Sequence, residues 1–365
     1  MGIKRAGAGV VATAGAVALT AAMLSSVPTA AEPTLPPDAS TTVPMQVPTE
    51  LPTVLSTGAP LSADATSSGS VQCEFQESGD FEGVNGVFAQ GDSVYAATYN
   101  EGLGISTDGG QTYTMITKNT KKIKTNAFAD VYAQGDNVYA TGAVGMYISS
   151  NGGRTWDRKT TSDFTRGWHS IFASGDTVWA GSWRYPRKST KGTKNKDWKK
   201  KKKGIPFRGR KTFVVFAVGE TVYATSQSWQ KNPGALFVST NGGDNWTPRT
   251  TSDGLPDATG DVFAQGDTVY VTPGGNRPGG GRANVTAPRI STDAGTSFSP
   301  LGPASFWTDV VGKTQKTSIF AQGDMIYVGT LEGLAISADG GQSFELVNVT
   351  HPLLSSNFVN DVYAV

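Results

Sequence analysis

Short apolar segments separated by tight turns occupy most of the chain from residue 85 onward. In one representative stretch, residues 86–90 (GVFAQ) and 93–98 (SVYAAT) are rich in aromatic and β-branched residues. They are separated by Gly91-Asp92, a turn that suits glycine's access to positive φ. Residues 102–106 (GLGIS) and 112–117 (TYTMIT) follow, with a second glycine turn between them. These runs predict four successive β-strands, and no segment shows the period of an amphipathic helix.

The phrase that covers the first two strands recurs along the chain. Copies of VFAQGDSVYAAT begin at residues 87, 131, 171, 215, 262 and 319, and a shortened copy, DVYAV, begins at residue 361. A repeat of roughly 40 to 57 residues with four strands in each predicts an all-β fold, a β-propeller of four-stranded blades. The aligned aromatic residues are Phe88, Tyr132, Phe172, Phe216, Phe263, Phe320 and Tyr363.

A second phrase, STDGGQTY at residues 106–113, recurs at residues 149, 239, 291 and 337, between the third and fourth strands. Asp108 is expected to accept hydrogen bonds from its own turn, and Ser106 to fix the end of the third strand. The glycines permit left-handed backbone, and Tyr113 is expected to place its ring in the core. The residues with this structural role are Ser106, Asp108, Gly110, Tyr113, Ser149, Asn151, Gly153, Trp156, Ser239, Asn241, Gly243, Trp246, Ser291, Asp293, Gly295, Phe298, Ser337, Asp339, Gly341 and Phe344.

The pattern Ser-x-Asp-x-Gly-x-Thr-aromatic resembles the Asp-box (BNR) repeat over about residues 85–365. Asn151 and Asn241 replace the aspartate conservatively, whereas the third repeat has Lys191 at that position and a longer segment before Trp198. The resemblance implies a propeller of the superfamily that includes sialidases and sortilin-like receptors. It says little about function, because xyloglucan hydrolases and photosystem assembly factors carry similar repeats.

The sequence leaves the closure of the ring open. Six blades are complete, and the segment FVNDVYAV (358–365) begins a partial seventh. The segment SVQCEFQ (70–76) is a candidate outer strand, so that segments from both ends of the sequence would share the closing blade. A six-bladed ring with a remnant, a seven-bladed ring with a defective seam and a truncated chain all agree with the pattern.

The N-terminal segment has the pattern of an export signal. Lys4 and Arg5 precede an Ala-, Val- and Leu-rich run over about residues 10–27, and small residues follow at 29–31. We expect a signal peptide over 1–31, with an uncleaved membrane anchor as the alternative. Residues 32–69 are rich in Pro, Thr and Ser and predict a disordered linker before a propeller at 70–365. Cys73 is the only cysteine, so no intrachain disulfide can form.

Charge is distributed unevenly, although the formal net charge is only +1 and indicates no nucleic-acid partner. The loops after the second and fourth strands are expected on one face, opposite the short glycine turns. They combine arginine with aromatic residues, which suits an anionic sugar polymer; ordinary solvated loops are the alternative. The Lys-rich run at 191–204 is a second candidate for polyanion binding, or a flexible solvated hairpin. The ligand-binding candidates are Arg166, Trp168, Trp183, Arg184, Tyr185, Arg187, Trp229, Arg277, Arg282 and Trp307.

Candidate catalytic chemistry is weak, and the catalytic residues are unknown. A sialidase needs an arginine triad, a tyrosine nucleophile with a glutamate and an aspartate acid, but no glutamate lies near Tyr185 in sequence. His169 and His351 have no partners at metal-ligand spacing, so no metal and no cofactor is expected. The loose sialidase set is Arg184, Arg277, Arg282, Tyr185 and Asp309. The acids considered for a paired-carboxylate glycosidase, which are more simply explained as turn caps, are Asp163, Asp253, Asp257 and Asp309.

Together these patterns favour a secreted or cell-surface binding module over an enzyme. We expect a monomer, with no transmembrane segment after signal cleavage, that recognises an anionic polysaccharide, another cell-envelope polymer or a protein through its loop-rich face. A sialidase-like glycoside hydrolase and an assembly or scaffold factor without a small ligand are the alternatives.

Overall fold

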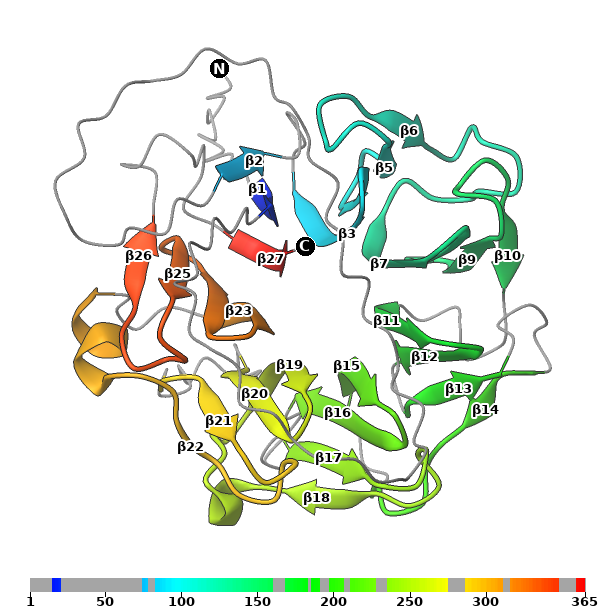
Figure 1. Cartoon of the computed structure of the whole chain (residues 1–365). Coiled ribbons are helices and arrows are strands. Elements are labelled where there is room, and N and C mark those ends of the chain that lie inside the picture. The colour runs from blue at the N-terminus through cyan, green and yellow to red at the C-terminus, as the bar shows by residue number, and fades with distance from the viewer. Residues whose placement is uncertain are drawn as a thin grey trace, which may run out of the picture. The chain divides into compact units, whose positions relative to one another are not determined.

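The computed structural model describes residues 15–20, 74–77, 83–159, 168–182, 185–190, 197–206, 211–227, 235–274, 286–310, 316–347 and 359–364. Residues 1–21 and 73–365 form one compact unit, and residues 22–72 form a second. The predicted linker belongs to the second unit and lies outside the described residues. Cys73 belongs to the first unit and also lies outside the described residues. The compact first unit is all-β: six antiparallel four-stranded sheets surround a common centre as the blades of a β-propeller, as predicted (Figure 1).

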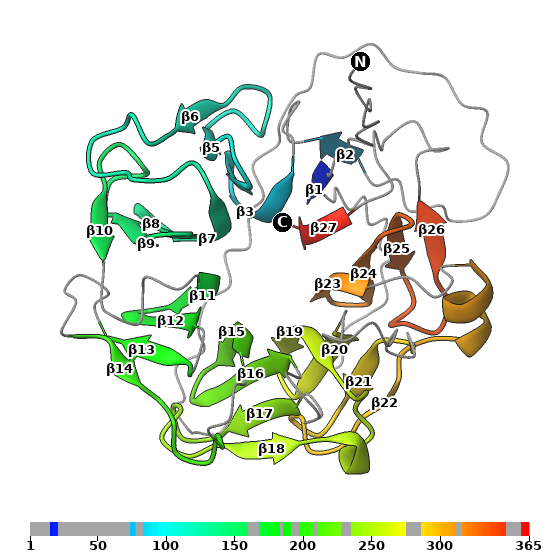
Figure 2. The same cartoon turned by 180° about the vertical axis from the view of Figure 1, so that it is seen from behind.

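Each blade is a meander in which consecutive strands are neighbours, and the first strand lies nearest the centre (Figures 1 and 2). Blades 1 to 3 contain β3 (Val84–Gln90), β4 (Ser93–Thr98), β5 (Leu103–Ser106) and β6 (Thr114–Ile116); β7 (Phe128–Gln134), β8 (Asn137–Gly142), β9 (Gly145–Ser149) and β10 (Asp157–Lys159); and β11 (Trp168–Ser174), β12 (Thr177–Ser182), β13 (Arg187–Ser189) and β14 (Lys199–Lys200).

Blades 4 to 6 repeat this arrangement. They contain β15 (Lys211–Val218), β16 (Thr221–Gln227), β17 (Ala235–Ser239) and β18 (Thr247–Arg249); β19 (Thr259–Gln265), β20 (Thr268–Pro273), β21 (Arg289–Ser291) and β22 (Ser299–Pro300); and β23 (Lys316–Gln322), β24 (Met325–Thr330), β25 (Leu334–Ser337) and β26 (Glu345–Val347). Two short helices, which the sequence pattern did not predict, lie in connections between blades: the 3-10 helix η3 (Thr251–Asp253) and the π-helix η4 (Phe306–Val310). Within the described part of the chain, no helix is long and apolar enough to span a membrane.

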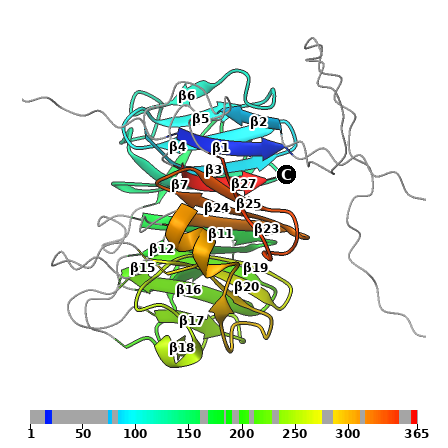
Figure 3. The ribbon, with the colours of Figure 1, turned by 90° about the vertical axis from the view of Figure 1, so that its left-hand side faces the viewer.

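A three-stranded sheet of order β2–β1–β27 completes the ring, from β2 (Glu74–Glu77), β1 (Gly15–Thr20) and β27 (Val359–Ala364) (Figure 3). Strand β1 pairs antiparallel with β2 and parallel with β27, with Val17 opposite Val362. Segments from both ends of the sequence therefore share one sheet, which is one of the expected closures. The middle strand comes from the apolar run predicted to be a signal peptide, and the repeat pattern gave no reason to place that run in the ring.

The glycine hairpins before each fourth strand are fixed by the same hydrogen bonds in five blades. In blade 1 the Gly110 N–H donates to Ser106 Oγ at 2.8 Å, and the Thr112 N–H donates to Asp108 Oδ1 at 2.9 Å. In blade 4, Gly243 N–H donates to Ser239 Oγ at 2.9 Å. The corresponding bonds in blades 2, 5 and 6 lie between 2.8 and 2.9 Å. The local bonds expected from the sequence phrase are therefore present.

These hairpins also bond to the turn between the first and second strands of their own blade. Gly109 N–H donates to the Asp92 carbonyl at 2.9 Å in blade 1, and Gly242 N–H donates to the Glu220 carbonyl at 2.8 Å in blade 4. Equivalent bonds occur in blades 2, 5 and 6. The two sets of short turns thus lie on one face, as predicted.

Where the structure describes them, the segments that follow the fourth strands do not lie freely on the opposite face, which corrects the expectation of solvated loops. The four that the structure describes at their start each place an apolar residue in the same cluster as the hairpin aromatic of the next blade. Ile205 packs with Trp246, and Leu255 with Phe298. Ile123 belongs to the same cluster as Trp156, and Leu301 to that of Phe344. Burial of these residues joins adjacent blades, because each apolar surface is covered only when the neighbour is in place.

A closed cycle of aromatic rings lines the centre. The rings of Phe88 and Tyr132 have centroids 4.3 Å apart, and Tyr363 of β27 lies 4.6 Å from Phe88 and 4.8 Å from Phe320. The remaining neighbours in the cycle lie 4.5 to 5.0 Å apart. One ring comes from each first strand, so the cycle has seven members and β27 supplies the seventh.

Candidate functional site

Three aspartates line the centre one layer above the aromatic cycle, toward the start of the first strands. Asp130, Asp261 and Asp361 each precede the aromatic of their strand by two residues, so the two side chains lie on the same face of the strand. Asp361 Oδ2 accepts a hydrogen bond from Val87 N–H of blade 1 at 2.9 Å. Asp130 Oδ2 accepts one from Ile171 N–H at 2.8 Å. Each carboxylate therefore bonds to the backbone of the following blade.

Burial raises the pKa of all three carboxyls. The pKa of Asp261 rises to about 7, through burial first and the Asp361 charge second. Burial also raises the pKa of Asp361 to about 6, although hydrogen bonds from Val87 and Val362 oppose the shift. The pKa of Asp130 rises well above its usual value for the same first reason, with the Asp361 charge adding to it.

These carboxylates were not identified from the sequence as special, although the phrase Asp-Val-aromatic occurs three times at the starts of repeats. Their oxygens already accept backbone hydrogen bonds from the next blade, as Asp261 Oδ2 does from Ile319 N–H at 2.9 Å. Among the described residues, no three histidine, cysteine, aspartate or glutamate side chains lie together in a way that could hold a metal ion. The three aspartates thus bond neighbouring first strands to one another across blades.

Most of the predicted ligand-binding residues cannot be placed. Strand β11 begins at Trp168, of which only the backbone is described. Tyr185 is half-buried and packs against the core of blade 4, and its carbonyl accepts a hydrogen bond from Ser182 Oγ at 2.7 Å. The candidates outside the described residues are Arg166, Trp183, Arg184, Trp229, Arg277 and Arg282.

Two predicted ligand-binding residues are buried, which corrects the expectation that they lie on an open rim. Arg187 is 4% exposed because it begins β13, inside blade 3, opposite Ala180. Trp307 is 1% exposed because the expected loop folds as η4. Its indole Nε1–H donates to the Leu301 carbonyl at 2.6 Å, and its ring lies 5.0 Å from Phe344. Both side chains are therefore part of the buried interior.

Two of the acids considered for catalysis bond to neighbours in their own segments. Asp253 Oδ2 accepts the Thr250 N–H at 2.8 Å in the cap of η3, as a turn cap should. Asp309 is exposed and accepts a hydrogen bond from the adjacent Thr308 Oγ1 at 2.8 Å. Asp163 lies outside the described residues.

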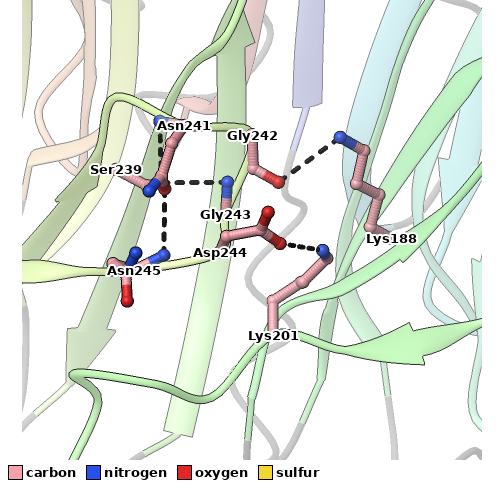
Figure 4. Close-up of polar contacts among 8 residues, drawn as sticks. All are labelled: Lys188, Lys201, Ser239, Asn241, Gly242, Gly243, Asp244 and Asn245. Carbon is pink, nitrogen blue, oxygen red and sulfur yellow. Dashed lines mark hydrogen bonds and ion pairs between the residues drawn. The ribbon is translucent and has the colours of Figure 1, made fainter.

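The strongest concentration of charge in the described chain is a lysine block, Lys199–Lys203, on the outer edge strand β14 and the turn after it. Lys201 Nζ forms an ion pair with Asp244 Oδ1 at 2.6 Å, in the hairpin of blade 4 (Figure 4). That ion pair lowers the pKa of Asp244. Lys188, on β13, donates to the Gly242 carbonyl of the same hairpin at 3.3 Å (Figure 4). Its ammonium group also lies over the Trp179 ring.

Three other lysines of the block are exposed to solvent. Lys199, Lys202 and Lys203 are exposed, and their ammonium groups form no ion pair with another residue of the described chain. Asp244 therefore pairs with one lysine of the block, Lys201. An edge strand with this charge also resists pairing with other strands, because lysine repels a second edge.

No protein-family profile and no curated protein matches the chain. The fold is similar to that of solved structures. One, titled YCF48 bound to D1 peptide, is 15% identical with a TM-score of 0.55, and the match covers 76% of this chain and 85% of that one. YCF48 from Cyanidioschyzon merolae is 16% identical with a TM-score of 0.52, over 73% and 85% of the two chains.

A third similar structure is the extracellular domain of the one component system BT4673 from B. thetaiotaomicron. It is 11% identical with a TM-score of 0.56, and the match covers 77% of this chain but only 35% of that one. At these identities the similarity shows a shared β-propeller fold and nothing of its ligands.

Proposed function

We propose that this chain is an exported propeller of the Asp-box type that binds an anionic polymer of the cell envelope, such as an acidic glycan or a cell-wall polymer. The lysine block is the observation that carries the proposal, because five consecutive lysines lie on the outer strand β14 and the turn after it, and Asp244 pairs with Lys201 among them. Such a patch attracts extended polyanions by summed charge rather than by one pocket. The loop-rich face, with Arg184, Arg277 and Arg282, is proposed to extend this surface.

The assignment to the Asp-box type is part of the same proposal. It is supported by the identical serine and aspartate or asparagine hydrogen bonds of five hairpins. Export is supported by the charged and apolar N-terminal pattern. Part of that run is β1 of the closing sheet, so cleavage after residue 31 would remove this strand from the ring.

The test compares the chain with the triple variant Lys199→Gln, Lys202→Gln, Lys203→Gln. Polygalacturonate and a teichoic acid are the probes, at about 20 mM and about 300 mM salt, where screening differs strongly. We expect the variant to bind at least about tenfold more weakly at low salt, and the difference to shrink at high salt. The Lys→Arg triple, which keeps the charge, should bind as the parent does.

Binding that ignores both salt and the glutamine substitutions would overturn the proposal. So would the failure of both polymers to bind at low salt. Selective capture of an acidic protein by the same block, without either polymer binding, would replace the polymer by a protein partner.

A further inference from the structure

A pocket of about 280 Å³ lies at the junction of blades 1 and 2, away from the lysine block. One wall is the turn after β6, with Lys121 and Lys122, and the other is the hairpin between β9 and β10, with Arg154 and Trp156. We call it the junction pocket. Its volume is near the lower end of the range for small-molecule sites and would hold a group of about the size of one sugar.

The turn stands away from the hairpin here, whereas the equivalent junctions between blades 3 and 4 and between blades 4 and 5 are closed by a backbone hydrogen bond. Between blades 3 and 4, Trp246 N–H donates to the Lys203 carbonyl at 3.0 Å. Between blades 4 and 5, Phe298 N–H donates to the Asp253 carbonyl at 2.8 Å. The corresponding atoms, Trp156 N and the Lys121 carbonyl, are both in the described chain and form no such bond. The junction pocket lies where these two junctions make backbone contact.

A lysine replaces glycine in the turn that opens the pocket. Gly204 and Gly254 have φ of 91° and 88°, and a Cβ at either would lie 2.0 Å from the carbonyl oxygen of the hairpin residue. Lys122 occupies the equivalent position with φ of 70°, a left-handed conformation that side chains disfavour. A strained lysine at the mouth of a pocket points to a role for its charge.

The charge balance of the pocket also differs from that of its closed counterpart. The hairpin position that carries Asp244 in blade 4, facing Lys201 and Lys203, carries Arg154 in blade 2. The other hairpins have Gln111, Thr296 and Gln342 there. Blade 2 thus has a cation, Arg154, at the position where blade 4 has Asp244, the carboxylate that pairs with Lys201.

One carboxylate, Asp157, also lines the pocket and pairs with two lysines. Asp157 Oδ1 pairs with Lys122 Nζ at 2.5 Å, and Asp157 Oδ2 lies 3.9 Å from Lys159 Nζ. Lys121 and Arg154 are exposed and their charged groups have no partner in the described chain. The indole Nε1–H of Trp156, whose side chain is 3% exposed, is a buried donor without an acceptor. The Trp246 indole N–H also lacks an acceptor, but the backbone of Trp246 is hydrogen-bonded to Lys203 across its junction, so that junction is closed.

We infer that the junction pocket binds an oxyanion, the carboxylate or phosphate group of a sugar-sized ligand, held by Lys121, Lys122 and Arg154 with the Trp156 indole in its wall. Arginine suits such a group because its planar fork can donate two hydrogen bonds to it. This site shares no residue with the lysine block, so an experiment can contradict one proposal without contradicting the other.

The experiment follows the indole resonances of the whole chain by NMR while glucuronate and inorganic phosphate are added separately. Trp156→Phe, which installs the residue type found in blades 5 and 6, identifies the Trp156 signal by its loss. We expect that signal to shift with at least one probe, which also tells carboxylate from phosphate as the preferred group. Arg154→Gln, the residue of blades 1 and 6, should weaken the apparent affinity about fivefold or more.

Two controls make the result specific. Arg154→Lys, which keeps a charge, should weaken binding less than Arg154→Gln, and Lys202→Gln in the lysine block should leave the titration unchanged. The inference is wrong if neither probe moves the Trp156 signal. It is equally wrong if Arg154→Gln binds as tightly as the parent chain.

Discussion

Aspartate occurs in two opposite settings in this protein. Asp108, on an exposed hairpin, accepts hydrogen bonds from Ser106 and Thr112, and these lower its pKa to about 2. Asp261, in the channel wall, has its pKa raised to about 7, mainly by burial. The first setting stabilises the charged carboxylate, whereas the second penalises it, because desolvation outweighs two backbone hydrogen bonds.

The raised pKa of Asp261 predicts a pH dependence of stability. The neutral acid is favoured in the folded state, so its contribution is fully present below the unfolded pKa of about 3.9 and is lost as pH rises through about 7. Asp261→Asn keeps an acceptor for Ile319 N–H without the charge. We expect the variant to be more stable than the parent at pH 8, by about 1 to 3 kcal/mol, and close to it at pH 4.

Urea unfolding between pH 4 and pH 9 measures this difference. Asp339→Asn is the matched control, since hydrogen bonds from Ser343 and Ser337 lower the pKa of Asp339 and its contribution is lost as pH falls. Asparagine already occupies the same hairpin position at Asn151 and Asn241, so the control should fold. A channel variant less stable than the parent at pH 8 would show that the charged carboxylate is the stabilising form.

The residue scale also shows where prediction from sequence is reliable. The bonds of Asp108 could be predicted because donor and acceptor lie within four residues. The burial of Arg187 and Trp307 could not, because it depends on strands and a helix that the loop composition did not indicate.

At the scale of elements, the hairpin and the segment before it form one unit across two blades. The hairpin could be predicted because its sequence phrase is local. The insertion of Ile205 beside Trp246, in contrast, joins residues about forty positions apart. Nothing in the composition of the connecting segments distinguishes such a residue from a solvated loop residue. The expectation of free loops was wrong at these points because cross-blade packing decides them.

Ile205→Ala tests that unit. Ile205 is 6% exposed, and removing its side chain leaves a cavity against Trp246, with an expected cost of about 2 to 4 kcal/mol in the free energy of unfolding. Ile205→Val should cost about 1 kcal/mol. The exposed neighbour Pro206 serves as the control position, where alanine should change little. Chemical denaturation measures all three, and a cost below about 1 kcal/mol for the alanine variant would mean that Ile205 does not join the blades.

At the scale of the molecule, the blade repeat and its four strands were predictable because each repeat carries the same two phrases. The closing sheet was only partly so. Its β27 carries the repeat phrase, but β1 pairs with β27 in parallel, whereas the strands of the six complete blades pair antiparallel. An apolar run before a linker has the same composition whether it is an export signal or a buried strand, so composition alone could not decide its place.

The seventh aromatic ring should control closure. Tyr363→Ala removes the contacts to both Phe88 and Phe320, and we expect it to lower the free energy of unfolding by about 3 kcal/mol. Tyr363→Phe should be nearly neutral, because phenylalanine fills the same position in blades 1, 3, 4, 5 and 6. Thermal and chemical unfolding give the comparison, and equal stability of the two variants would mean that the cycle of rings does not hold the seam.

The aromatic cycle makes the seven junctions interchangeable in kind, since every first strand offers one ring to each neighbour. Moving the chain break to another turn should therefore leave the ring contacts, and the stability they provide, unchanged. A circular permutant opened in the exposed turn at Gly135 should reassemble the same cycle, with its original ends fused, because no ring contact is cut.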